Sequence, residues 1–173
     1  MKIFIGCSSH IDIDSKYLAD ADYISKRIAD NGYDLVIGGV NDKGMFGKII
    51  NNFKSHKIYL YTLKLYNEKV DKNIKCTYLD TTFDRTKEIY KNSDKLLFLP
   101  GGTGSLSEIL SMLEEKRTIS SNKEIIIYNQ DGYYYDLIKF ITKLIKNKFN
   151  DISILNYIKI FNDKDDLIKY LEV

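Results

Sequence analysis

The feature that most constrains the fold of this chain is a regular alternation of short apolar runs with longer segments of helical periodicity. The apolar runs do not alternate polar with apolar residues, which is typical of strands buried on both faces of a parallel sheet. The sequence therefore predicts an α/β fold, a doubly wound parallel sheet with helices on both faces. The expected strands are residues 3–5, 34–37, 58–61, 76–79, 95–99, 124–128 and 157–161, separated by helices that include 17–28, 84–92, 133–146 and 165–171.

Composition narrows the class of protein. The chain has 173 residues, 44% of them hydrophobic, and a formal net charge of +2, which predicts one soluble domain over residues 1–173. Mixed charges of this kind give no reason to expect nucleic acid or a membrane as partner, and no segment is long enough to cross a bilayer. The two cysteines, Cys7 and Cys76, match neither a metal spacing nor a disulfide framework, so we expect no metal. The start of the chain lacks a signal-peptide pattern, and we expect the protein in the cytoplasm.

One stretch, residues 96–108, carries the strongest functional signal. It runs from an apolar strand into the only proline of the chain, Pro100, and places three glycines within the next four residues before a helical pattern begins. Glycine lets the backbone approach a ligand closely, and the first amides of a helix favour an anion. The spacing matches neither the P-loop nor the dinucleotide fingerprint. The sequence therefore predicts a phosphate-binding turn of another type.

Topology places further residues beside this turn. In a doubly wound sheet, ligands bind beyond the carboxyl ends of the strands where the strand order reverses. We therefore expect the loops 7–10 and 100–104 to flank one crevice. The helix that begins near Arg85 and the strand that follows it cover similar distances in opposite directions, which predicts that Arg85 lies level with the turn.

The segment Pro100–Glu108 resembles the P-G-G-x-G-T-x-x-E signature of the LOG (Lonely Guy) family, the cytokinin riboside 5′-monophosphate phosphoribohydrolases formerly labelled lysine decarboxylases. Three other segments resemble family motifs in the same order, over nearly the whole chain. They are Gly6–Ser9, the glycines of Gly38–Gly47, and Asp131–Tyr134.

This resemblance implies a Rossmann-like domain that hydrolyses the N-glycosidic bond of a nucleoside 5′-monophosphate, such as AMP or an N6-modified, cytokinin-type AMP. It implies catalytic roles for Arg85 and Glu108, a homodimer, and no cofactor. A carboxylate near the ribose can stabilise the positive charge of glycosidic cleavage or activate water, whereas arginine can only orient groups or balance charge. The implied phosphate- and nucleotide-binding residues are Gly101, Gly102, Thr103, Gly104 and Ser105, with Ser8 and Ser9 from the first loop.

The sequence also departs from the family pattern. Thr86 stands where the family usually has a lysine after its arginine, so that one cation is either missing or supplied by Lys87. Val40 replaces a glycine in a loop that is one residue longer than the pattern. Both departures affect the expected base preference and activity.

Three alternatives stay open at this stage. Residues 105–108 also form a capping-box pattern, in which Glu108 would bond to a helix amide and do no chemistry. The same scaffold would serve a non-catalytic nucleotide or cofactor carrier, because a fold does not decide a function. A decarboxylase would need a lysine in a pyridoxal phosphate site, and no lysine here lies in a recognisable one.

Overall fold

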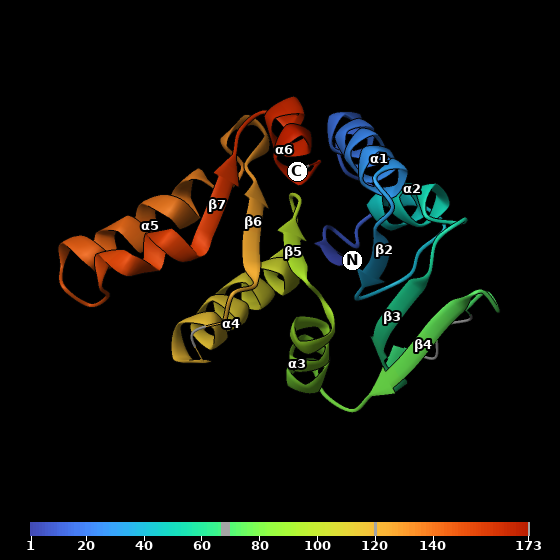
Figure 1. Ribbon diagram of the computed structural model, residues 1–173, viewed down its shortest axis with the longest axis horizontal. Helices are drawn as coiled ribbons and strands as arrows, with labels where there is room; N and C mark the ends of the chain where they lie inside the picture. The colour runs from blue at the N-terminus through green and yellow to red at the C-terminus, as the bar shows by residue number, and fades with distance from the viewer. Residues whose placement is uncertain (67–69, 120, 173) are drawn as a thin grey trace.

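A parallel sheet forms the centre of the molecule (Figure 1). The computed structural model describes residues 1–66, 70–119 and 121–172, and in these its seven strands are all parallel, in the order β4-β3-β2-β1-β5-β6-β7. The predicted doubly wound fold is confirmed. The strands are β1 (Lys2–Gly6), β2 (Asp34–Ile37), β3 (Ile58–Leu63), β4 (Ile74–Leu79), β5 (Lys95–Phe98), β6 (Glu124–Tyr128) and β7 (Ile158–Phe161).

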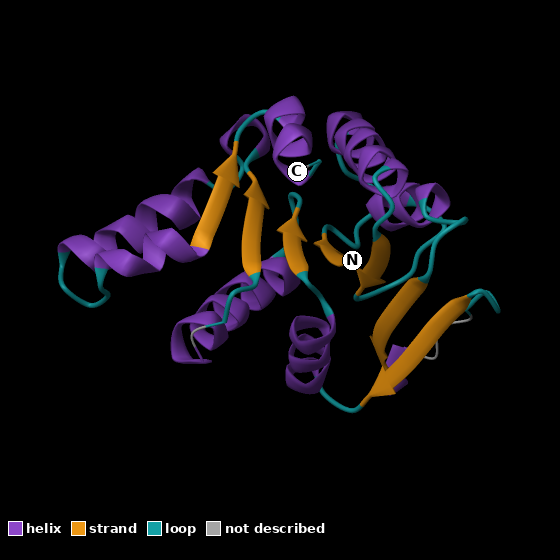
Figure 2. Ribbon diagram, in the orientation of Figure 1, coloured by secondary structure: helices purple, strands orange, loops and turns teal. Residues whose placement is uncertain are grey.

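Helices cover both faces of this sheet (Figure 2). One face packs against α1 (Ser15–Asp30), α2 (Gly44–Asn52) and α6 (Lys164–Leu171), and the other against α3 (Thr82–Asn92), α4 (Thr103–Ile119) and α5 (Tyr135–Lys146). Within β1, Ile3 and Ile5 join the first core and Phe4 joins the second. Since successive strand residues point to opposite faces, both cores need apolar residues, which explains the unbroken apolar runs.

The strand order reverses between β1 and β5, which are neighbours in the sheet. The helix that follows β1 covers one face, and the helix that follows β5 covers the other. The two loops that leave these strands therefore separate and open a crevice at the carboxyl edge. Residues 7–10 and 100–104 lie there, as the sequence predicts.

Hydrogen bonds hold the glycine-rich turn at this edge. Three successive carbonyl oxygens each accept a bond: Leu99 from the Tyr134 hydroxyl at 2.8 Å, Pro100 from the Ser8 amide at 3.1 Å, and Gly101 from the Tyr133 hydroxyl at 2.9 Å. The tyrosines come from the segment between β6 and α5. The turn is thus fixed by contacts from two other parts of the chain.

Several element boundaries differ from the expected ones. The strand expected at 76–79 begins at Ile74 and pairs along its full length with β3, and a 3-10 helix over Ile152–Tyr157 was not foreseen. The helix expected from residue 133 begins at Tyr135, because Asp131 and Gly132 take positive φ angles of 50° and 76° and form a turn. Among the described residues no helix is long and apolar enough to span a membrane.

The Tyr134 bond yields a stability prediction. Tyr134 is 2% exposed, and Tyr134→Phe leaves the buried carbonyl of Leu99 without this donor, so we expect a loss of about 1–2 kcal/mol in the free energy of unfolding. Urea unfolding measures it. The matched control is Tyr135→Phe, whose ring is 61% exposed, and equal stabilities of the two variants would contradict the role assigned to Tyr134.

Candidate active site

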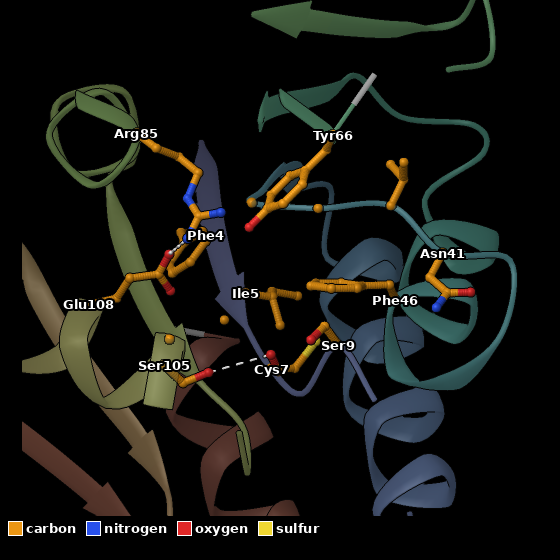
Figure 3. A pocket seen from close by; sticks show the side chains of 15 residues that line it. Phe4, Ile5, Cys7, Ser9, Asn41, Phe46, Tyr66, Arg85, Ser105 and Glu108 are labelled. Atoms are coloured by element: carbon orange, nitrogen blue, oxygen red, sulfur yellow. Dashed lines mark hydrogen bonds and ion pairs between the residues drawn. The ribbon is translucent and has the colours of Figure 1, made fainter. Parts of the chain in front are cut away.

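A cavity of about 520 Å³ opens at the carboxyl edge of the sheet, beside the loops that follow β1 and β5 (Figure 3). Its walls come from the ends of β1 and β2, the start of α2, the segment after β3, and the facing sides of α3 and α4. The lining residues are Phe4, Ile5, Gly6, Cys7, Ser9, Gly38, Gly39, Val40, Asn41, Phe46, Tyr66, Arg85, Gly104, Ser105 and Glu108.

A carboxylate and a guanidinium meet in one wall of this cavity. Glu108, in the second turn of α4, lies 3.5 Å by its Oε1 from an Arg85 terminal nitrogen on α3. Their side chains are only 9% and 14% exposed, respectively. Arg85 Nε is buried and has no hydrogen-bond partner in the described structure. The pair is therefore long and incompletely bonded, and Arg85 retains donor capacity that another group could use.

Burial changes the protonation of Glu108. Its pKa rises from the ordinary value of 4.5 to about 7, because burial disfavours the charged form, and the nearby Arg85 guanidinium partly opposes this shift. A carboxyl group with a pKa near 7 can both release and take up a proton at neutral pH. The cavity thus contains a carboxyl group whose pKa lies near neutral because of desolvation.

The turn that begins α4 packs tightly against the first loop. The Ser105 hydroxyl donates to the Cys7 carbonyl at 3.4 Å. A Cβ atom built on Gly101 would lie 2.1 Å from Ser105 Oγ, so this contact requires glycine. A Cβ atom on Gly104 would meet nothing within 4 Å, which leaves the cavity beside the helix terminus open. Burial, with a smaller contribution from Glu108, raises the pKa of the Cys7 thiol well above its usual range.

Not every residue predicted for the site lines the cavity. Arg85, Glu108, Gly104, Ser105 and Ser9 do, and the predicted level of Arg85 beside the turn is confirmed. Their functional roles stay predictions. Thr103 lines instead a smaller cavity of about 190 Å³ on the other side of the ion pair, while Gly101, Gly102 and Ser8 line neither cavity. The Ser8 hydroxyl accepts a bond from the His10 amide at 3.1 Å.

The structure also decides two questions that the sequence left open. Glu108 does not act in a capping box with Ser105, because α4 begins at Thr103 and Ser105 lies inside the helix, bonded to Cys7. Lys87 does not supply the cation missing at Thr86. Its side chain lines an outer groove between α3 and α4 and is not among the residues of the main cavity.

Sequence reasoning missed the wall opposite the ion pair. Phe46 lies in the first turn of α2 and lines the cavity. Tyr66 ends the 3-10 helix Lys64–Tyr66, in a segment without readable periodicity. One signal could have found it. A residue just after β3 lies at the same carboxyl edge as the glycine-rich turn.

The raised pKa of Glu108 leads to a prediction about stability. Between pH 4.5 and about 7 the folded protein keeps the Glu108 proton and the unfolded chain releases it. The folded state then binds more protons, so its stability falls as pH rises through this window. Glu108→Gln removes this titration, and we expect the variant to gain about 3 kcal/mol on the wild type between pH 4.5 and 8.

Urea unfolding at a series of pH values measures this difference. The matched control is Glu115→Gln, an exposed residue of the same helix, whose stability should follow the wild-type pH dependence. A constant difference between Glu108→Gln and the wild type at all pH values would refute the raised pKa.

Curated proteins similar to this chain over most of its length carry one functional name. A protein of Oryza sativa subsp. japonica named as a probable cytokinin riboside 5′-monophosphate phosphoribohydrolase is 24% identical over 173 residues, which cover 98% of this chain and 75% of that protein. A cytokinin riboside 5′-monophosphate phosphoribohydrolase of Arabidopsis thaliana is 25% identical over 175 residues, with coverages of 99% and 81%.

Solved structures agree with the fold at lower identity. The molybdenum cofactor carrier protein of Chlamydomonas reinhardtii matches with a TM-score of 0.71 at 18% identity, over 98% of this chain and 96% of that chain. The molybdenum cofactor binding protein of Rippkaea orientalis matches with a TM-score of 0.72 at 17% identity, over 99% and 95%. At these identities the likeness concerns the fold alone.

The family comparison covers most of the chain. A family model described as "Possible lysine decarboxylase" matches residues 23–171, which include both Arg85 and Glu108. This is the older label of the family that the glycine-rich signature resembles. The chain belongs to the LOG family.

Proposed function

We propose that this protein hydrolyses the N-glycosidic bond of a nucleoside 5′-monophosphate, AMP or an N6-modified, cytokinin-type AMP, to free base and ribose 5-phosphate. The observation that carries the proposal is the buried pair of Glu108 and Arg85, set in the cavity wall beside the glycine-rich start of α4. The names of the LOG relatives support the same activity. A homodimer, implied by the resemblance, stays a prediction.

The cavity suggests where each part of the substrate would lie. The phosphate is assigned to the N-terminus of α4, where Gly104 leaves open space and the helix dipole favours an anion. Ser105 and Ser9 lie beside it in the same cavity. Glu108 follows one turn later along the helix, so that a ribose attached to this phosphate would reach its carboxylate.

The chemistry then follows from the charge of the two side chains. As the bond between C1′ and the base nitrogen breaks, its electron pair leaves with the base and positive charge develops on the ribose. The Glu108 carboxylate stabilises this charge and accepts a proton from the water that bonds to C1′. The departing base takes up a proton from solvent and Glu108 then releases its proton to solvent, so that one water is consumed in all. Arg85 lowers the pKa of Glu108 and so favours its ionised form, and it orients the side chain.

A non-catalytic carrier of a nucleotide or cofactor is the second candidate. It is favoured by Thr86 in place of the family lysine, and by the printed names of the structural neighbours as molybdenum cofactor carriers. Release of adenine from AMP, followed by chromatography, separates the two candidates.

The first prediction from the proposed hydrolysis concerns Glu108→Gln, which preserves the size of the side chain and removes its charge. We expect adenine release from AMP to fall by about 100-fold or more, the usual contribution of a positioned acid–base group. AMP should still bind, as calorimetry would record. A variant that released adenine at the wild-type rate would refute the catalytic role assigned to Glu108.

The second prediction concerns Arg85→Gln. Because Arg85 lowers the pKa of Glu108, its loss should raise that pKa further and move the acidic limb of the kcat/KM–pH profile to higher pH. Arg85→Lys, which keeps the charge, should return the limb towards its wild-type position. An unmoved limb in Arg85→Gln would show that the guanidinium does not act on Glu108.

A further inference from the structure

The two ends of the cavity differ in polarity. Its two charged lining residues in the described structure, Arg85 and Glu108, lie in one wall. Figure 3 shows the opposite part, where the rings of Tyr66 and Phe46 project into the cavity from two separate segments. An aromatic end that faces a polar end matches the polarity of a nucleotide, whose base is apolar on its two faces and whose phosphate is charged.

Phe46 provides a fixed surface in this aromatic end. It lies in the first turn of α2, is 9% exposed, and belongs to the core beneath that helix. A Cβ atom built on Gly39 would lie 3.2 Å from the Phe46 ring, so the ring rests directly against the backbone after β2. The ring is therefore held in place by the protein before any ligand binds.

Tyr66 provides a second aromatic surface of the cavity and is held less firmly. It ends the 3-10 helix that follows β3 and is 52% exposed, a large exposure for an aromatic ring in a cavity wall. Its hydroxyl points into the cavity, on the side of Arg85 (Figure 3). A planar ligand that covered this ring would remove apolar surface from water on both sides.

We infer that Phe46 and Tyr66 form an aromatic clamp that holds the base of a purine nucleoside monophosphate by stacking. The inference rests on the proposed function, from which it takes the positions of the phosphate and the ribose. It adds that Tyr66 helps to decide which base is accepted. The two rings are uncharged, and the charged lining residues among those described, Arg85 and Glu108, belong to another wall, so the aromatic end suits a neutral heterocycle. A purine, with its larger face, should bind better than a pyrimidine.

Tyr66 is the residue to test, since Phe46 is also part of the core. Calorimetry on a Glu108→Gln background, which prevents turnover, would compare AMP, UMP and ribose 5-phosphate with and without Tyr66→Ala. We expect AMP binding to weaken by about tenfold or more, the usual effect of losing one stacked ring. Ribose 5-phosphate, which lacks a base, should bind equally in both proteins, and the preference for AMP over UMP should shrink.

Two further variants control the experiment. Tyr66→Phe keeps the ring and should retain AMP binding, and Leu65→Ala changes a 70% exposed neighbour in the same 3-10 helix without effect. Unchanged AMP binding in Tyr66→Ala, or an equal loss for AMP and ribose 5-phosphate, would overturn the clamp. The proposed hydrolysis is tested separately by adenine release from wild-type protein. If Tyr66-dependent AMP binding occurs without release, the clamp stands and the hydrolase proposal fails.

Discussion

The adjacency of β1 and β5 is the constraint on which the rest of the structure depends. The chain leaves each of these parallel strands at the same edge but continues into helices on opposite faces. The loops must diverge, and the space between them cannot be filled by either helix. The groups of the candidate site reach this space from strand ends, the segments that follow them and the first two turns of helices, so the site follows from the winding of the sheet.

In this crevice two charged side chains are buried at a cost in electrostatic free energy. Glu108 is buried beside a cation that only partly compensates it, and Arg85 keeps a buried donor without a partner. The glycine-rich turn beside them is well bonded, because the three carbonyls of residues 99–101 each accept a hydrogen bond. A buried and incompletely bonded ion pair in a cavity wall is what a functional site is expected to show.

Much of the fold could be predicted because its signals are local. Apolar runs mark the buried strands, and glycines mark the turn at residues 101–104, so that topology alone brought Arg85 beside it. The capping-box interpretation of Glu108 failed because helix starts are set by backbone geometry that the pattern of residues 105–108 does not encode. Sequence reasoning missed the pairing of Tyr66 with Phe46 because it depends on packing between segments distant in the sequence, although the place of Tyr66 just after β3 pointed to this edge. The family resemblance pointed to Glu108 and Arg85, but it carries no information about this aromatic wall.

The buried thiol of Cys7 has a consequence of its own. A cysteine attacks peroxides and disulfides chiefly as its thiolate, and the raised pKa of Cys7 favours the neutral thiol at physiological pH. A neutral sulfur also adds no second negative charge beside Glu108. Burial therefore disfavours thiolate chemistry at the cysteine in the cavity wall.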